Sequence, residues 1–165
     1  EAVASLPNRA FLLLAGGPRL PAHETIRRDL VAAAERYGVS DRLVVTGYLE
    51  PAEVPIALEA MDVVAVPYAT DSSMSYSLHR ALGQGRPVVA TDLPTMREVQ
   101  ARGSCLALVP SADPAAFGET LARLLADAPA RARLAAAARS YAACESVATA
   151  AARTLRVYYA VREGH

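Results

Sequence analysis

Five short apolar segments recur along the first two thirds of the sequence, and helical patterns separate them. Each segment is a nearly continuous apolar run, which is typical of a strand buried on both faces. The segments are residues 10–15, 42–49, 62–68, 87–91 and 105–110. Strands that alternate with helices predict an α/β fold, in which a parallel sheet is covered by helices on both faces. Ligands in such sheets bind at the carboxyl ends of the strands.

The helical patterns have recognisable starts and stops. We expect helices at residues 23–37, 50–60, 73–84 and 94–101, and the second of them restarts at Pro55. In the first of these helices, Ile26 and Leu30 share one apolar face. The alternation stops after the fifth strand, where Asp113 and Pro114 open a helix that runs to about residue 125. Helices at residues 130–143 and about 146–161 follow, so we expect one domain over residues 1–165.

Composition excludes several function classes. The 17 basic and 17 acidic residues cancel, which argues against a nucleic-acid surface. All basic residues are Arg, so no Lys is available as a Schiff-base former or general base. Cys105 and Cys144 both open or close apolar runs, and we expect both to be buried small hydrophobes. The three histidines are scattered without metal-ligand spacing, so no metal site is expected. No signal peptide or long apolar run occurs, and the default expectation is a cytoplasmic protein.

The stretch from Val66 to Asp92 carries the clearest functional signal. Its loop places four serines between the end of a strand and the start of a helix: Ser72, Ser73, Ser75 and Ser77. One serine is enough to cap a helix, and four exceed that need. The free amides of Met74, Ser75 and Tyr76, together with the helix dipole, would hold a phosphate. The alternative is a serine-rich turn with no ligand.

Other polar positions follow strand ends and have two interpretations each. Gly16 and Gly17 let the backbone approach a ligand, or they form a plain turn; they do not match a dinucleotide fingerprint or a P-loop. Asp71 and Asp92 could contact a ligand hydroxyl, or they could cap helices or form Asx-turns. Arg80, on the helix after the serines, is either a ligand residue or a solvent-exposed side chain.

The order of these segments resembles the C-terminal, donor-binding Rossmann-like domain of retaining glycosyltransferases with the GT-B fold, in family GT4 (glycosyl transferases group 1). The resemblance covers nearly the whole chain. The matching segments are residues 12–18, 41–49, 61–67, 81–92, 98–99, 103 and 109–114. The arginine- and alanine-rich helices and the closing pair Tyr158–Tyr159 are similar as well.

The resemblance implies a two-domain enzyme that transfers a sugar from a nucleotide-diphosphate sugar with retention, without a metal or other cofactor. It implies that this chain is a fragment. An N-terminal Rossmann-like domain would hold the acceptor and could provide peripheral membrane association, and a strand before Ala2 would carry an Arg and a Lys for the diphosphate. The isolated domain is then expected to be inactive, whereas the full-length protein is an enzyme. The final helix would cross to the other domain, which would leave Val157, Tyr158 and Val161 exposed here.

The family signature is a pair of glutamates eight positions apart, which contact the donor sugar and the ribose. Carried over, they fall on Ser72 and Arg80, and the usual Gly-Phe-Gly becomes Ser73-Met74-Ser75. Arginine only donates hydrogen bonds, so Arg80 cannot copy a carboxylate, but it can pair with phosphate. Leu49 in the loop 47–50 would contact the base. The donor-binding residues expected are Gly16, Gly17, Leu49, Ser72, Ser73, Met74, Ser75, Tyr76 and Arg80, and no catalytic residue is assigned.

The loss of both glutamates favours a second hypothesis of a different class. In it, the chain is a catalytically degenerate GT-B domain that serves as a binding or scaffold module. A third hypothesis, a GT-B sugar epimerase, requires an acidic or histidine cluster for proton abstraction at the strand ends, and the sequence offers none there.

Overall fold

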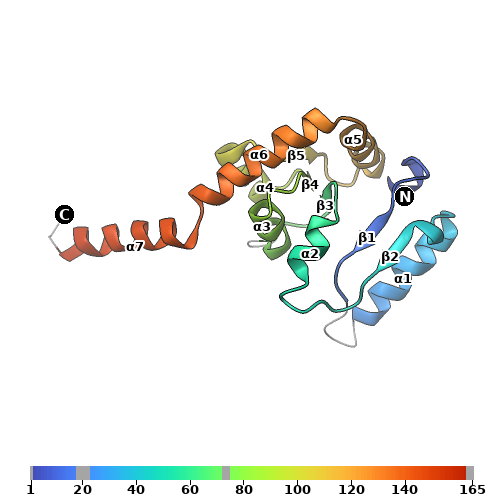
Figure 1. Cartoon of the computed structure of the whole chain (residues 1–165), viewed down its shortest axis with the longest axis horizontal. Helices are drawn as coiled ribbons and strands as arrows, with labels where there is room; N and C mark the ends of the chain where they lie inside the picture. The colour runs from blue at the N-terminus through green and yellow to red at the C-terminus, as the bar shows by residue number, and fades with distance from the viewer. Residues whose placement is uncertain (1, 18–22, 72–74, 163–165) are drawn as a thin grey trace.

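The strands of the described residues pair in parallel, and hydrogen bonding divides them between two sheets (Figure 1). A computed structural model describes residues 2–17, 23–71 and 75–162. β1 (Leu12–Leu14) pairs with β2 (Leu43–Val45), and β4 (Val88–Thr91) lies between β3 (Val64–Val66) and β5 (Leu106–Val109). The α/β class and the parallel strands are confirmed. The expectation of one sheet is wrong for the described residues, because no ladder joins β1 to β3.

The helices lie where the sequence patterns predict them, with shifts of a few residues at their ends. α2 begins at Val54 with Pro55 in its first turn, and residues 51–53 form a turn instead of an earlier helical segment. The last helix matches its predicted range within one residue at each end. The helical segments are η1 (Ala2–Ser5), α1 (His23–Arg36), η2 (Ser40–Arg42), α2 (Val54–Glu59), α3 (Tyr76–Gly83), α4 (Pro94–Gly103), α5 (Pro114–Ala126), α6 (Ala128–Cys144) and α7 (Val147–Arg162).

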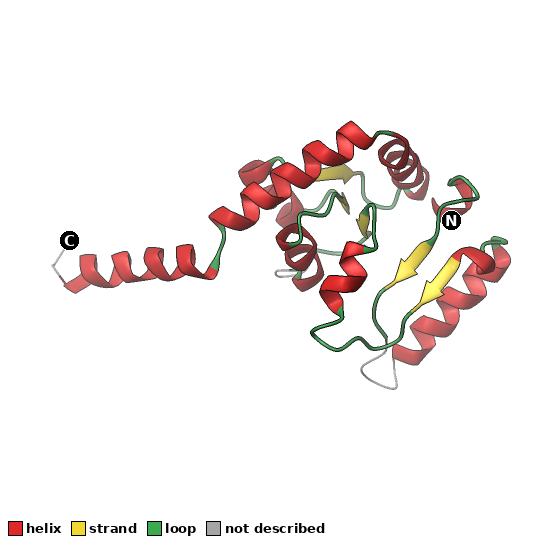
Figure 2. Ribbon diagram, in the orientation of Figure 1, coloured by secondary structure: helices red, strands yellow, loops and turns green. Residues whose placement is uncertain are grey.

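Helices cover both faces of the β3–β4–β5 sheet (Figure 2). All four residues of β4 are buried, and successive side chains point to opposite faces. Val88 and Ala90 pack into a cluster with residues of α3, α4 and α6, whereas Val89 packs with Phe117 and other residues of α5. The uninterrupted apolar run of this strand is therefore the consequence of two covered faces.

A buried arginine holds the N-terminal segment in place. The guanidinium of Arg42 donates to the carbonyls of Val3, Leu6 and Pro7 at 3.1–3.2 Å. On the other side, η1 lies against α5, where a Cβ at Gly118 would come within 2.6 Å of the Ser5 hydroxyl. Arg42 and Gly118 together fix η1 between the β1–β2 unit and α5.

The burial prediction for Cys144 is wrong, and one residue of the predicted apolar helix face is exposed. That residue is Ile26, which lies in the first turn of α1 and is 67% exposed. Cys144 is exposed at the end of α6, whereas Cys105 is buried as predicted. Burial raises the pKa of the Cys105 thiol, so this side chain behaves as a small hydrophobe.

The last helix projects away from the body and buries none of its residues (Figure 1). Val157, Tyr158 and Val161 are all exposed, as the resemblance implied. Among the helices that the structure describes, none has the length and apolarity that a membrane span requires.

Two leucines in helices provide a test of this distribution of the core. Leu82 in α3 is fully buried, and Leu155 in α7 is 51% exposed. Because both changes alter helix propensity equally, only burial distinguishes them. We expect Leu82→Ala to lower the free energy of unfolding by about 2–5 kcal/mol and Leu155→Ala to change it by less than about 0.5 kcal/mol. Urea unfolding followed by circular dichroism measures both, and equal losses would contradict the assigned core.

Candidate functional site

The loops after β1 and β2 touch at the carboxyl ends of their strands. Gly16 and Gly47 form an isolated bridge, and the Gly16 amide donates to the Thr46 hydroxyl at 3.1 Å. Gly17 has no room for a side chain, because a Cβ there would lie 2.7 Å from the backbone nitrogen of Tyr48. The close approach of the two loops therefore explains Gly17, and a backbone φ of +135° explains Gly16, in both cases without a ligand. Contact of Gly16 and Gly17 with a donor stays a prediction.

The loop from Gly47 leads to α2 along the same edge. Leu49, the predicted contact for the base, is half-buried between the exposed residues Tyr48 and Glu50. The Glu50 amide donates to the carboxylate of Glu53 at 2.7 Å, which ties the loop to the turn before α2. Leu49 is thus held in an ordered segment, and a planar apolar base is the kind of group that its side chain could contact.

Ser75 caps the N-terminus of α3. Its hydroxyl accepts from the Leu78 amide at 3.1 Å and lies 2.8 Å from the Tyr68 hydroxyl. The residue is only 8% exposed, so its side chain is engaged inside the protein. The first-turn amides of Tyr76 and Ser77 have no intrahelical acceptor and stay available for an anion. The helix begins later than the predicted Ser73, and Ser72, Ser73 and Met74 lie outside the described residues.

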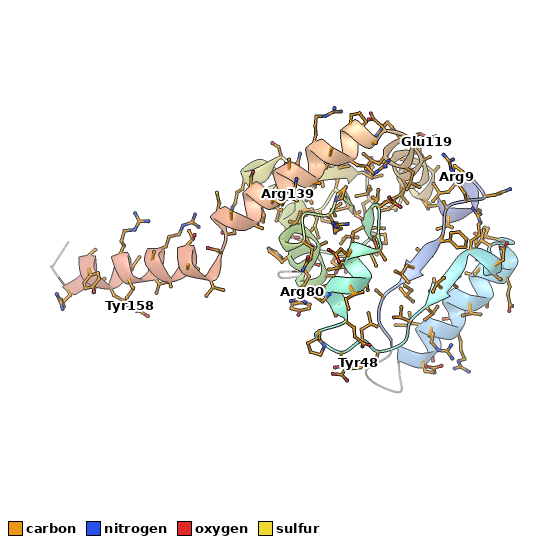
Figure 3. All side chains as sticks on the ribbon, viewed as in Figure 1. Arg9, Tyr48, Arg80, Glu119, Arg139 and Tyr158 are labelled. Atoms are coloured by element: carbon orange, nitrogen blue, oxygen red, sulfur yellow. The ribbon has the colours of Figure 1, made fainter. Side chains whose placement is uncertain are left out.

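Arg80 lies partly buried beside this helix N-terminus. Its guanidinium carbon is 5.7 Å from the ring centroid of Tyr76, which is itself 72% exposed. The Nε atom of Arg80 is buried and has no hydrogen-bond partner among the residues that the structure describes. Figure 3 shows Arg80 and Tyr48 at one edge of the body, away from Arg9 and Glu119. The alternative of an ordinary solvent-exposed arginine does not fit this environment.

Both candidate aspartates have partners within the protein. The carboxylate of Asp71 accepts from the hydroxyl and, at 3.4 Å, from the amide of Thr95, so it caps the first turn of α4 from a distant loop. Asp92 accepts from Nε and Nη2 of Arg97 at 2.6 and 3.0 Å. The hydrogen bond from Arg97 lowers the pKa of Asp92. The structural interpretation therefore accounts for both side chains.

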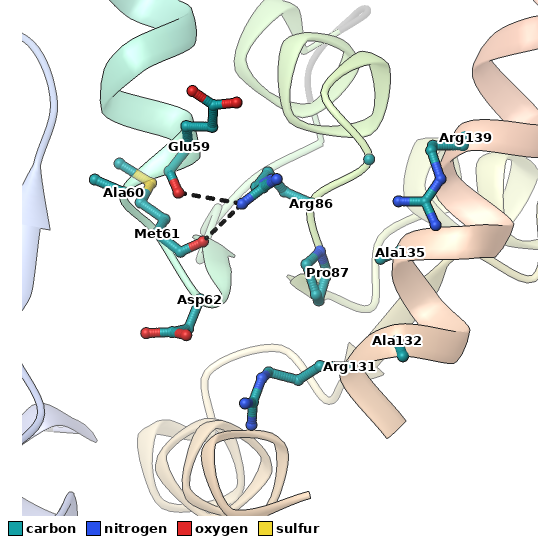
Figure 4. A pocket seen from close by; sticks show the side chains of 11 residues that line it. Glu59, Ala60, Met61, Asp62, Arg86, Pro87, Arg131, Ala132, Ala135 and Arg139 are labelled. Carbon is teal, nitrogen blue, oxygen red and sulfur yellow. Dashed lines mark hydrogen bonds between the residues drawn. The ribbon is translucent and has the colours of Figure 1, made fainter. Parts of the chain in front are cut away.

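A hollow of about 290 Å³ lies at the opposite end of the sheet (Figure 4). It is lined by residues that precede β3 and β4 and by arginines that complete helix ends. Arg86 donates to the carbonyls of Glu59 and Met61 at the end of α2, and Arg131 donates to those of Leu124 and Leu125 in α5. Cations at helix C-termini neutralise the carbonyl dipoles there. We therefore assign Arg86 and Arg131 a structural role.

Comparison with known proteins identifies the family. A model of the family "Glycosyl transferases group 1" matches residues 1–127. The chain belongs to this family. The D-inositol 3-phosphate glycosyltransferase of Xylanimonas cellulosilytica is 36% identical over 158 residues, which make up 96% of this chain and 37% of that protein. The chain thus spans well under half the length of this curated relative.

Solved structures of glycosyltransferases share the fold. Anabaena Alr3699/HepE in complex with UDP matches with a TM-score of 0.84 at 22% identity, over 94% of this chain and 43% of that one. The C-terminal domain of the group 1 protein LpcC from Francisella tularensis matches with a TM-score of 0.68 at 14% identity, over 85% and 87% of the two chains. The predicted family, and the assignment of the chain to the C-terminal domain of a GT-B glycosyltransferase, are confirmed.

Sequence reasoning missed the contacts that join separate loops at this edge. Asp71 and Thr95 are 24 positions apart, and nothing in their local pattern connects them. Tyr68 and Ser75, whose hydroxyls are in contact, are seven positions apart, and no local sequence pattern predicts their contact either. The signal that the sequence does carry is the preference of serine and aspartate for helix caps.

The pairing of Asp92 with Arg97 predicts a pH effect of known sign. A lowered folded-state pKa means that the pair stabilises the fold above the ordinary value of 3.8 and loses this effect as pH falls through the lowered pKa. We expect the Asp92 carboxyl to titrate below 3.8 and to return toward that value in Arg97→Ala. Carbon-13 NMR titration measures the shift, and Arg102→Ala, which changes a distant arginine, should leave it in place. An ordinary Asp92 pKa in the unmodified protein would contradict the pairing.

Proposed function

We propose that this chain is the donor-binding half of a retaining glycosyltransferase, which binds a nucleotide-diphosphate sugar and passes the sugar to an acceptor. One observation carries the proposal. In a member of the group 1 family, the capped N-terminus of α3 opens at the carboxyl end of β3, which is where α/β proteins bind ligands. Support also comes from the structural neighbour Alr3699/HepE, which was solved with UDP.

In this proposal the donor lies along the edge formed by the ends of β1, β2 and β3. The first-turn amides at Tyr76 and Ser77, with the dipole of α3, hold the diphosphate. The segments at Gly16–Gly17 and Gly47–Leu49 flank the nucleoside, with Leu49 against the base. Fixed dipoles aimed at the diphosphate stabilise the charge that develops as the nucleoside diphosphate departs. Ser72, Ser73 and Met74 belong to the same proposed site by sequence position.

We further propose that the rest of a longer protein completes this fold with a strand between β1 and β3 and with a second domain. The Leu14 carbonyl accepts from Thr46, and the Val64 amide donates to Pro87. Because neighbouring residues of a strand point their backbone groups to opposite edges, those of Leu13 and Ala65 face away from their partner strands. β1 lies between β2 and β3 in Figure 1, and Leu14 is exposed although its strand is wholly apolar. Edges of this kind pair with further strands.

Two amides test this completion of the sheet. We expect the amides of Leu13 and Ala65 to exchange rapidly with solvent in the 165-residue chain. In a longer polypeptide of the same protein, a new ladder would slow their exchange by about tenfold or more. Hydrogen exchange by NMR measures both, and the Val89 amide, in a strand paired on both edges, serves as the protected control. Unchanged exchange at both amides would contradict the added strand.

A degenerate domain with a binding or scaffold role is the second candidate function. The observation that favours it is Arg80, which stands where the resemblance implies an acidic residue for the ribose. This alternative predicts that the longer protein neither hydrolyses nor transfers any donor sugar. Sugar transfer that falls when Tyr76 is changed to Pro would refute it.

A proline substitution tests the proposed diphosphate site directly. Ser75 has an extended backbone and Tyr76 is the first helical residue, so proline fits at position 76 and removes only the first-turn amide and the ring. Tyr76→Ala removes the ring and keeps the amide. We expect one of UDP, GDP and ADP to bind, and Tyr76→Pro to bind it about tenfold more weakly than Tyr76→Ala. Calorimetry with the longer protein measures this difference.

Two outcomes of that calorimetry would contradict the proposal. If the longer protein binds none of the three nucleotides while its circular dichroism shows that it is folded, the proposed donor-binding function is wrong. Equal affinities of Tyr76→Pro and Tyr76→Ala for the nucleotide would show that the diphosphate does not bind at the N-terminus of α3.

A further inference from the structure

Arg80 differs from the other buried or partly buried arginines in having an unsatisfied donor. Arg42, Arg86 and Arg131 all donate to backbone carbonyls. The Nε of Arg80 is shielded from solvent and donates to no described residue, and no described carboxylate lies within ion-pair distance of the side chain. A buried donor without an acceptor costs free energy, and the cost is larger for a charged group.

The location of this cation adds to its electrostatic cost. Arg80 lies in the second turn of α3, and its guanidinium carbon lies back over the ring of Tyr76, the first residue of the helix. Helical side chains point toward the N-terminus of their helix, so this direction is the normal one. Although Arg80 opens the last turn of this eight-residue helix, its guanidinium carbon lies 5.7 Å from the ring centroid of the first helical residue. The charge therefore lies toward the positive end of the helix dipole, where anions are favoured over cations.

The carboxylates that follow β3 and β4 do not compensate this charge. Asp71 is held by the hydroxyl of Thr95, and Asp92 is held by both donor nitrogens of Arg97. The hydroxyl of Ser75, at the cap of the same helix, already accepts from the Leu78 amide. Among the residues that the structure describes, the free helix amides and the Arg80 guanidinium thus form one positive site without an internal counter-charge.

We infer that the guanidinium of Arg80 binds an anionic phosphate oxygen of the nucleotide. The positive charge of this side chain then contributes to ligand recognition at the N-terminus of α3. The inference rests on the proposed nucleotide-binding function and assigns a specific residue to it. A guanidinium has donors and no acceptor, so it selects phosphate oxygens and cannot accept hydrogen bonds from sugar hydroxyls. Bidentate pairing with phosphate is the interaction for which its planar shape is suited.

The test compares a nucleoside diphosphate with its nucleoside. Calorimetry uses the longer protein with whichever of UDP, GDP and ADP binds, and with the matching nucleoside. Arg80→Met keeps an unbranched apolar side chain and removes the charge, so it is expected to fold. We expect it to weaken binding of the diphosphate by about tenfold or more and to leave nucleoside binding unchanged. The dependence of diphosphate affinity on salt should also become less steep, because one phosphate contact is lost.

The matched control is Arg36→Met. Arg36 also stacks on a tyrosine, with its guanidinium carbon 5.0 Å from the ring centroid of Tyr37, but it is exposed and lies at the C-terminal end of α1. This variant should bind the diphosphate like the unmodified protein. It separates the effect of losing a charge anywhere on the protein from the loss of the charge at α3.

Each alternative result has a distinct meaning. If the unmodified protein binds no nucleotide, the proposed function fails and this inference fails with it. If the unmodified protein binds a nucleotide and Arg80→Met binds it equally well, the inference fails while the proposed function stands. A parallel loss of diphosphate and nucleoside affinity in Arg80→Met would also overturn it, because it would show that Arg80 shapes the site without contacting phosphate.

Discussion

The two parallel ladders of β4 are the constraint on which the rest of this structure depends. Val88 pairs with Val64 on one edge and with Leu106 on the other, and all four residues of the strand are buried. Parallel strands need helical crossovers, and these crossovers cover both faces of the sheet. The same ladders bring the carboxyl ends of β3 and β4 to one edge, so that the loop with Asp71 can reach Thr95 and the N-terminus of α3 can open beside it.

Electrostatic balance distinguishes the structural arginines from the proposed ligand residue. Since the chain contains no lysine, every Lys/Arg-type charge is an arginine, and the buried or partly buried Arg42, Arg86 and Arg131 donate to backbone carbonyls. Arg80 instead stands at the positive end of a helix with its buried Nε unpaired among the described residues. A fold tolerates such a charge most easily where a bound anion balances it. The replacement of the family's second glutamate by Arg80 is therefore consistent with the inferred role of this side chain in binding phosphate.

Local patterns predicted the strands, their order along the chain and the α-helices that the structure describes. They did so because burial on two faces produces continuous apolar runs and because helix caps favour particular residues. The errors arose where the outcome depends on distant segments. Ile26 lies on a predicted apolar helix face but is exposed in the first turn of α1, and Cys144 is exposed as the last residue of α6. At the site, the capping preferences of serine and aspartate were visible, whereas the partners of Ser75, Asp71 and Asp92 depended on the packing of separate loops.

The sequence by itself determined the α/β class, the family and the serine-capped helix start at which we propose that phosphate binds, because these depend on periodicity, on turn residues and on short motifs. Only the tertiary structure decided that the strands of the described residues form two sheets, with no ladder between β1 and β3. It also decided that the two glycines serve a loop contact and that the aspartates are paired. These features depend on distances between residues remote in sequence. The unpaired Nε of Arg80 belongs with them, since burial and missing partners are properties of the packed chain.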